Sequence, residues 1–193
     1  MNIFQQKIIL ENHRAKLYLR TIDDFEGTLK IALDSKIWEW YPHIIATKAQ
    51  LQTHFEDCER AFQAENKYTF AIIDKQTGKI AGSTSFQAIS DFDKRLEIGW
   101  TWLGVDYQGT GLNKECKFLL LQYVFEVLQY ERVELKADVL NLPSCRAMEK
   151  IGATREGLLR SRRLMHGNRR RDSVYYSILK NEWPKIRKEI FRR

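Results

Sequence analysis

The pattern of apolar and polar positions along the chain predicts alternating strands and helices. Strict alternation over residues 96–103 predicts a strand, because successive side chains in a strand point to opposite faces of a sheet. Apolar residues recur at helical spacing over residues 113–129, and alternation returns over residues 132–139. A strand, a helix and a strand in this order favour a parallel pair of strands joined by a crossover helix.

The segments before and after residues 96–139 also show the apolar patterns of strands and helices. The other expected strands are residues 14–20, 68–74, 79–86, 154–165 and 169–179, the last two forming a hairpin. The other expected helices are residues 21–34, 47–66 and 141–152, and one that starts near residue 181. Because no repeat, low-complexity tract or linker separates these segments, residues 1–193 are predicted to form a single domain.

Composition limits the class of protein. Hydrophobic residues make up 44% of the 193 residues and charged residues 30%, which is ordinary for a soluble globular protein. No apolar run approaches the ~18 residues of a membrane span, and the N-terminus lacks a secretion signal, so a cytoplasmic location is expected. The cysteines and histidines lack metal-ligand spacing, so no metal is expected. The net charge of +7 indicates an anionic ligand or partner without identifying it.

A glycine-rich turn separates the strand at residues 96–103 from the helix that follows. Gly104, Gly109 and Gly111 give the turn backbone freedom that other residues lack. Because the first N–H groups of a helix have no partner within it, such a turn is a ready site for phosphate. The turn has neither the Gly-Lys-Ser/Thr of a P-loop nor the Gly-x-Gly-x-x-Gly of a dinucleotide-binding fold.

Two segments resemble those of a known family. Residues 108–113, Gln-Gly-Thr-Gly-Leu-Asn, resemble the Gln/Arg-x-x-Gly-x-Gly/Ala signature of the GCN5-related N-acetyltransferases, with Asn113 where Gly or Ala is usual. Residues 141–153 resemble the same family's Asn-x-x-Ser/Ala…Gly-Phe/Ala segment. The resemblance is greatest to the branch that includes the ribosomal-protein N-terminal acetyltransferases. It implies an α+β fold, with a mixed, twisted sheet of about six to seven strands flanked by helices.

The resemblance also implies an activity and a set of binding residues. The expected reaction is transfer of an acetyl group from acetyl-CoA, without a metal, to a primary amine by direct attack in a ternary complex. The amine would belong to a protein N-terminus or to a small molecule. The residues implied in binding acetyl-CoA are Leu103, Val105, Gln108, Gly109, Thr110, Gly111, Leu112, Asn113, Asn141 and Ser144.

Two residues are candidates for proton transfer. Glu97 starts the strand that leads to the turn, where the family often places the base that deprotonates the amine. An equally open interpretation is that Glu97 is an ion-pair partner, with Arg95 close by. Ser144 either protonates the departing thiolate, binds the CoA sulfur or caps its helix, since Met148 stands where the family often has a tyrosine acid.

Two further features leave alternatives open. Trp38, Trp40 and Tyr41 are either one wall of the acceptor pocket or a hydrophobic plug between the first two helices. The arginine-rich hairpin at residues 160–171 is either a solvated face or an attraction for an acidic acceptor, a ribosome or nucleic acid. A CoA-binding or nucleic-acid-binding module without turnover is therefore the alternative function. Both a monomer and a homodimer are compatible with the sequence.

Overall fold

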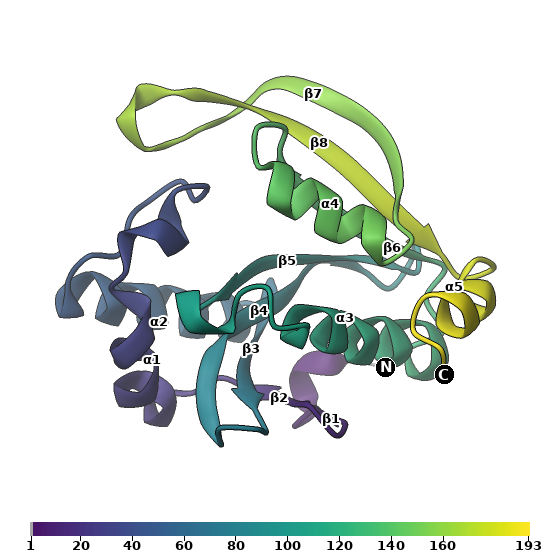
Figure 1. Ribbon diagram of the computed structural model, residues 1–193, viewed down its shortest axis with the longest axis horizontal. Coiled ribbons are helices and arrows are strands. Elements are labelled where there is room, and N and C mark those ends of the chain that lie inside the picture. The colour runs from purple at the N-terminus through teal and green to yellow at the C-terminus, as the bar shows by residue number, and fades with distance from the viewer. Residues whose placement is uncertain (1) are drawn as a thin grey trace.

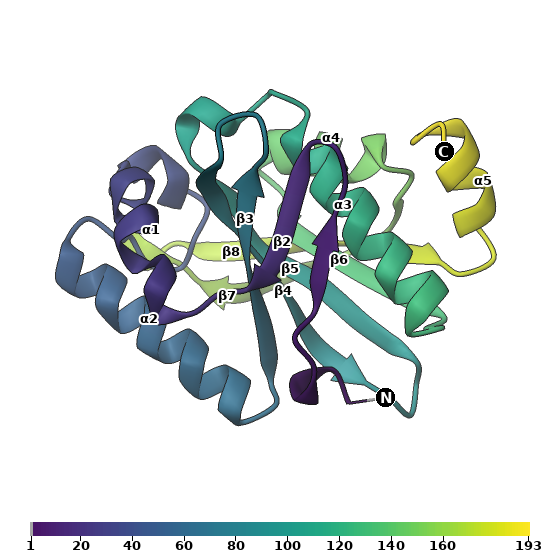
Figure 2. The ribbon, with the colours of Figure 1, turned by 90° about the horizontal axis from the view of Figure 1, so that it is seen from below.

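The computed structural model describes residues 2–193 and contains one eight-stranded mixed sheet (Figures 1 and 2). The strands are β1 Ile9–Glu11, β2 Ala15–Leu19, β3 Lys67–Asp74, β4 Lys79–Ser90, β5 Arg95–Leu103, β6 Arg132–Asp138, β7 Thr154–Leu164 and β8 Arg170–Leu179. Their order in the sheet is β1-β2-β3-β4-β5-β6-β8-β7. The sheet has one strand more than expected, because β1 is too short to show an alternating pattern.

Five α-helices flank the sheet. They are α1 Phe25–Ala32, α2 Lys48–Gln63, α3 Leu112–Gln122, α4 Leu142–Lys150 and α5 Trp183–Glu189. A π-helical segment, Tyr123–Val127, continues α3, and a 3-10 turn, Ser35–Trp38, follows α1. Among residues 2–193, no helix is long and apolar enough to cross a membrane. The predicted helices are all present, although the first begins as the separate 3-10 turn Ile22–Asp24.

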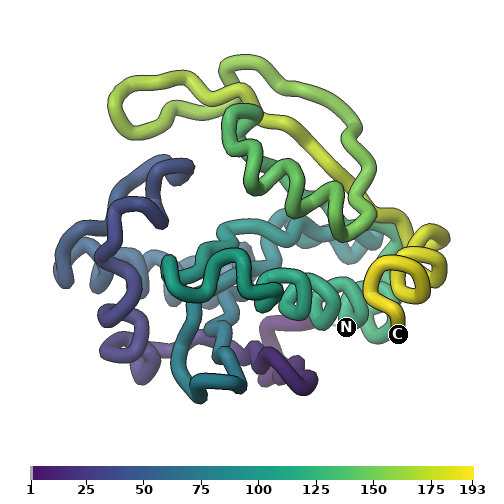
Figure 3. The backbone as a smooth tube through the Cα atoms, in the orientation of Figure 1, coloured from purple at the N-terminus to yellow at the C-terminus, as the bar shows by residue number. Residues whose placement is uncertain are grey.

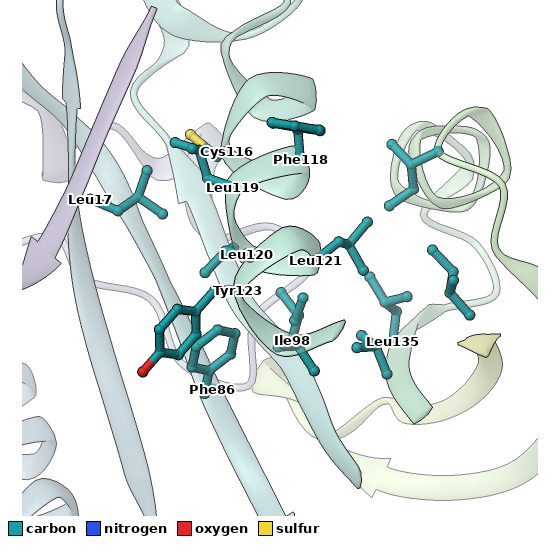
Figure 4. Close-up of a cluster of buried hydrophobic side chains, with 14 of the residues drawn as sticks. Leu17, Phe86, Ile98, Cys116, Phe118, Leu119, Leu120, Leu121, Tyr123 and Leu135 are labelled. Carbon is teal, nitrogen blue, oxygen red and sulfur yellow. The ribbon is translucent and has the colours of Figure 1, made fainter. Parts of the chain in front are cut away.

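The main core lies between α3 and the sheet. Leu119, Leu120 and Tyr123 project from the helical segment toward β4 and β5 (Figure 4). The rings of Tyr123 and Phe86 stack with centroids 6.2 Å apart, and Ile98 packs into the same cluster. Burial of this apolar stripe is what holds the helix against the strands.

Among residues 2–193, the strands β5 and β6 form the only parallel pair, and they separate early. Their pairing joins Arg95–Glu97 to Arg132–Glu134 and then stops. From there β6 stays paired with β8 as far as Asp138, while β5 stays paired with β4 as far as Leu103. The facing edges of both strands are therefore open beyond Glu97. We call this gap in the backbone pairing between β5 and β6 the cleft.

A β-bulge accompanies the opening. Ser85 pairs with Gly99 and Ser83 pairs with Trp102, so two residues of β5 lie opposite one residue of β4. Trp100, the first residue of the bulge, has a φ of +51°. A bulky residue in this region stores about 1–3 kcal/mol of strain, which the surrounding contacts must offset.

Lys117 is a cation enclosed beneath the bulge. Its side chain leaves α3 and donates a hydrogen bond to Thr101 Oγ1 at 2.9 Å, and Thr101 in turn shares a hydrogen bond with Thr84. Burial lowers the pKa of Lys117 from 10.5 to about 8. Below pH 8 the lysine is charged in the folded and unfolded chains alike, so the folded chain carries the cost of a buried charge.

Lys117→Met is expected to stabilise the fold at pH 7 by roughly 1–3 kcal/mol, because it removes that buried charge. The advantage should shrink between pH 8 and 10.5, since the folded wild-type chain loses the proton before the unfolded chain does. Urea unfolding of the wild-type and Lys117→Met proteins across this pH range measures the difference in their free energies of unfolding. Lys114→Met, on the exposed side of the same helix, is the control. A difference in unfolding free energy that does not change with pH would contradict the lowered pKa of the buried Lys117.

Candidate active site

The glycine turn leaves open space at the N-terminus of α3. Gly109 and Gly111 have φ values of +73° and +86°, and a Cβ added at either position would meet no atom within 4 Å. Among residues 2–193, no acceptor binds the backbone N–H groups of Gly109, Thr110 and Gly111. Unpaired N–H groups at the positive end of a helix form a site for an anion.

The flanks of the turn are fixed by side chains. Gln108 donates from Nε2 to the carbonyl oxygen of Leu103 at 3.0 Å, and Thr110 donates to the carbonyl oxygen of Tyr107. Leu112 is buried beneath the turn, whereas Val105 is exposed. Asn113 lies in the first helical turn with its side-chain oxygen buried and without a hydrogen-bond partner.

Helix α4 and the glycine turn lie on opposite sides of β5 in the view of Figure 1. Asn141 caps the helix, because its side-chain oxygen accepts a hydrogen bond from the Ser144 backbone N–H at 3.1 Å. Ser144 is half-buried in the first turn of α4. Met148 lies one turn later and is buried in the core. A serine hydroxyl is thus the side-chain donor that α4 offers near its start.

Glu97 occupies the vertex of the cleft, as the last residue of β5 that pairs with β6. The residue is 4% exposed. Oε1 accepts from Gln87 Nε2 and Oε2 accepts from Lys136 Nζ, each at 2.6 Å. Lys136 stands on β6 beyond the last backbone pair, so the ion pair spans the opening. The partner of Glu97 is Lys136, and Arg95 instead lies near Asp93 and Glu134.

The hydrogen bonds of Glu97 continue to the strained tryptophan. Gln87 accepts at Oε1 from Trp100 Nε1 at 2.7 Å while it donates to Glu97. A Cβ at Gly99 would lie 2.8 Å from Glu97 Oε1 and 2.9 Å from Gln87 Nε2. Glycine is therefore the residue that lets the carboxylate and the amide lie over the strand. Neither Gln87 nor Lys136 carried a signal in the sequence, because their contacts depend on strand register.

The aromatic segment after α1 has two roles. Trp38 is fully buried, donates to the carbonyl oxygen of Ala32 and packs against Trp102, with ring centroids 5.3 Å apart. The packing interpretation therefore describes Trp38. Tyr41 is half-buried and donates to the carbonyl oxygen of Thr101 in the bulge at 2.8 Å. Trp40 is half-buried.

A small polar hollow opens beside these aromatic rings, between α2 and the sheet. Its lining comprises Tyr41, His54, Cys58, Lys67, Thr69, Ser83, Ser85, Trp100 and Trp102. Burial, and secondarily the charge of Arg20, lowers the pKa of His54 to about 3, so this imidazole is neutral at physiological pH. Hydroxyl groups, a lysine and indole rings form the wall of the hollow, which lies on the same face of the sheet as Glu97.

The β7–β8 hairpin covers this face, and its arginines differ in environment. The tip overhangs the segment after α1 (Figure 3), and His166 Nε2 lies 3.1 Å from the carbonyl oxygen of Glu39. Arg163 and Arg171 point inward, and Arg169 forms an ion pair with the buried Asp138. Four others are exposed, namely Arg155, Arg160, Arg162 and Arg170. Only part of the hairpin is therefore a solvated face.

Within residues 2–193, no group of three or more His, Cys, Asp or Glu side chains is arranged to hold a metal ion. The three cysteines, Cys58, Cys116 and Cys145, are free and buried. Burial raises the pKa of the Cys116 thiol to about 12, so this thiol is inert as a nucleophile. The side chains that gather around the cleft are instead carboxylate, ammonium, guanidinium, hydroxyl and indole groups.

Comparison with known proteins identifies the family of this chain. The model of a family described as the acetyltransferase (GNAT) domain matches residues 16–154, which is more than half of the chain. The chain belongs to the GNAT acetyltransferase family. The match includes the strands that separate, the glycine turn and α4, and it confirms the resemblance expected from the two sequence segments.

Individual relatives agree with this membership. The uncharacterized N-acetyltransferase YnaD of Bacillus subtilis is 28% identical over 164 residues, which cover 83% of this chain and 90% of that protein. YdaF of Bacillus subtilis, named provisionally as a ribosomal N-acetyltransferase, is 34% identical over 106 residues, which cover 55% of this chain and 57% of YdaF. The crystal structure of a GCN5-related N-acetyltransferase from Brucella melitensis has a TM-score of 0.89 at 28% identity, covering 97% of this chain and 85% of that one.

Proposed function

We propose that this GNAT protein transfers an acetyl group from acetyl-CoA to a primary amine by direct attack in a ternary complex. The observation that carries the proposal is the cleft between β5 and β6, with a buried carboxylate at its vertex and an open glycine turn at its far end. A thioester bound along the free edge of β5 would lie between these two groups.

The binding of acetyl-CoA is assigned to three parts of the site. The N–H groups of residues 109–111 suit the pyrophosphate, because they are unpaired and face open space. The free edge near Leu103 and Val105 suits the amide groups of pantetheine. The start of α4, with Asn141 and Ser144, lies on the opposite side of the cleft and suits the thiol end.

The chemistry requires a neutral amine and a stabilised oxyanion. Glu97, directly or through a water, takes a proton from the amine, whose nitrogen forms a bond to the carbonyl carbon of the thioester. A free N–H on the β5 edge donates to the developing oxyanion, a contribution of about 3 kcal/mol in comparable sites. The carbon–sulfur bond then breaks, and the thiolate leaves as it is or takes a proton from Ser144.

The acceptor class has two candidates, a protein N-terminus and a small-molecule amine. The provisional name of YdaF, a ribosomal N-acetyltransferase, favours the first. A nucleic-acid-binding module without turnover is the competing function. The inward direction of Arg163 and Arg171 favours a site for a smaller ligand over a flat phosphate-binding surface.

The cytoplasm, where acetyl-CoA is available, is the location that this activity implies.

Release of free thiol from acetyl-CoA, with a panel of amines and peptides, tests the proposal directly. We expect acetyl-CoA to raise the melting temperature and RNA to leave it unchanged, because the proposal assigns the open turn to the pyrophosphate of acetyl-CoA. Stabilisation by RNA without thiol release would favour the competing function. Stabilisation by acetyl-CoA without thiol release from any amine would indicate a CoA-binding protein that does not turn over.

Gly111→Ala is expected to weaken acetyl-CoA binding by about tenfold or more, because the new Cβ enters open space at the turn to which we assign the pyrophosphate. Gly78→Ala is the matched control. Gly78 has a φ of +67° and open space around it, but it lies in the β3–β4 turn. Both changes introduce similar backbone strain, of about 1–2 kcal/mol. Equal losses of acetyl-CoA affinity in calorimetric titrations would exclude a special role for the turn.

Glu97→Gln is expected to lower kcat by about 10²–10⁴-fold, because glutamine cannot accept the proton. The defect should diminish as the pH approaches the pKa of the acceptor amine, which then arrives already neutral. Glu134→Gln, the residue paired with Glu97 on β6, is the control and should retain kcat. Full activity of Glu97→Gln at all pH values would leave Glu97 with only its ion-pair role.

Gly99→Ala is expected to lower kcat by about tenfold or more without unfolding the protein, because its Cβ would displace the flexible ends of Glu97 and Gln87. Gly157→Ala, in the exposed strand β7 with nothing within 4 Å of the added Cβ, is the control. Steady-state kinetics with melting temperatures separate the two effects. Unchanged kcat would mean that the position of the carboxylate is not critical.

A further inference from the structure

Two cations lie over the Trp100 ring and a third lies opposite one of them on the neighbouring strand, and none of the three has a salt-bridge partner among residues 2–193. Lys67 Nζ lies 5.2 Å from the centroid of the Trp100 ring, and the Arg163 guanidinium lies 5.1 Å from it. Arg171 comes from the neighbouring strand, where it pairs with Arg163. With residues 2–193 considered, none of the three side chains forms a salt bridge within 4.0 Å or a side-chain hydrogen bond.

Arg171 is the most enclosed of the three. It is 7% exposed, and its Nε is buried without a hydrogen-bond partner. Two carboxylates lie within electrostatic range, Glu97 and Asp138, but Lys136 and Arg169 already hold them. A buried guanidinium without a complete set of partners costs free energy unless a ligand supplies them. The unpaired donor therefore indicates a place for an anion.

The surroundings of the cluster also select against a cationic ligand. The hollow beside Trp100 is lined by hydroxyl groups from Thr69, Ser83 and Ser85 and by the neutral His54. None of the residues that line the hollow carries a carboxylate. An acceptor with several ammonium groups would meet Lys67, Arg163 and Arg171 without a counter-ion, and like charges at this range repel.

The cluster is separate from the glycine turn that we assign to the pyrophosphate. Ser85, Gln87 and Glu97 alternate along their strands with Phe86 and Ile98, so the two sets point to opposite faces of the sheet. Phe86 and Ile98 pack against α3, whose N-terminus carries the turn. The cations of the cluster therefore lie on the α2 face and are not part of the turn.

We propose that the acceptor of this enzyme is a primary amine that also carries a carboxylate or phosphate group, bound by Lys67, Arg163 and Arg171 beside Trp100. The inference rests on the proposed acetyltransferase function and names its substrate class. With the anionic group held there, the amine lies within reach of Glu97, which the Gln87 bridge links to Trp100. The same positive charges favour the neutral form of the amine, the form that attacks.

The test compares amines matched in size but different in charge. These are β-alanine with propylamine, phosphoethanolamine with ethanolamine, and spermidine as a polycation. We expect kcat/KM to be at least about tenfold higher for the anionic member of one or both pairs, and spermidine to be the poorest acceptor. The carboxylate and phosphate pairs distinguish the two anionic groups. Equal or better turnover of propylamine, ethanolamine or spermidine would overturn the proposal.

Arg163→Gln locates the preference. Because Arg163 is only half-buried, its replacement should leave the fold intact and lower kcat/KM for the preferred anionic amine by about 10–100-fold. The values for the uncharged amine and the affinity for CoA should stay within about twofold, as expected for a change that touches only the anion. Arg162→Gln, the exposed neighbour on the same strand, is the control. Equal losses of kcat/KM for the anionic and uncharged amines, or in Arg163→Gln and Arg162→Gln alike, would contradict a role of Arg163 in binding the anionic group.

Calorimetric titration of the same amines into the CoA-saturated protein keeps the two proposals distinguishable. Tighter binding of the anionic amine to the wild-type protein than to Arg163→Gln supports the anion site, whether or not thiol is released. Absence of thiol release with every amine, together with that binding difference, would reject turnover and retain the site. Thiol release without any preference for an anionic amine would retain the transferase and reject the site.

Discussion

The separation of β5 from β6 is the constraint on which the rest of the site depends. Three residue pairs hold the strands together, after which each strand stays with its other neighbour. Sheet twist drives such strands apart, and no backbone ladder resists it there. The Lys136–Glu97 ion pair crosses the opening in place of that ladder. Backbone groups along β5 are thereby left available for a ligand, and a carboxylate is fixed at the vertex.

The carboxylate is held in place by the same region of β5 that bears the strain. The bulge places Trp100 at a positive φ, and the hydrogen bond from its indole to Gln87 helps to offset this cost. Gly99 leaves the space in which Gln87 and Glu97 meet. The unfavourable backbone conformation of Trp100 thus orients the hydrogen bonds from its indole through Gln87 to Glu97. The side chain of Trp100 also lines the small hollow beside it. The proposed catalytic carboxylate and the local strain therefore lie in the same segment of β5.

The net positive charge of the chain is not spread evenly over its hairpin. Arg169 neutralises a buried aspartate, whereas Arg163 and Arg171 face the cleft without a carboxylate of their own. The contact of His166 with Glu39 holds the hairpin tip over the segment after α1. Charges that the sequence presents as one basic run therefore divide into a structural pair, a solvated set and a set directed at the proposed acceptor.

The sequence by itself determined the strand–helix–strand unit, the glycine turn and the capped start of α4, because hydrophobic period, glycine backbone freedom and capping are local properties. Membership of the acetyltransferase family followed from two such local segments and was confirmed by comparison. The sequence did not predict β1, because its three residues are too few to show an alternating pattern. Only the tertiary structure decided that Lys136 rather than Arg95 pairs with Glu97, that Trp38 is core, and that Lys67 and Arg163 meet at Trp100 with Arg171 opposite Arg163. These contacts depend on strand register and on the path of a hairpin, which no local pattern encodes.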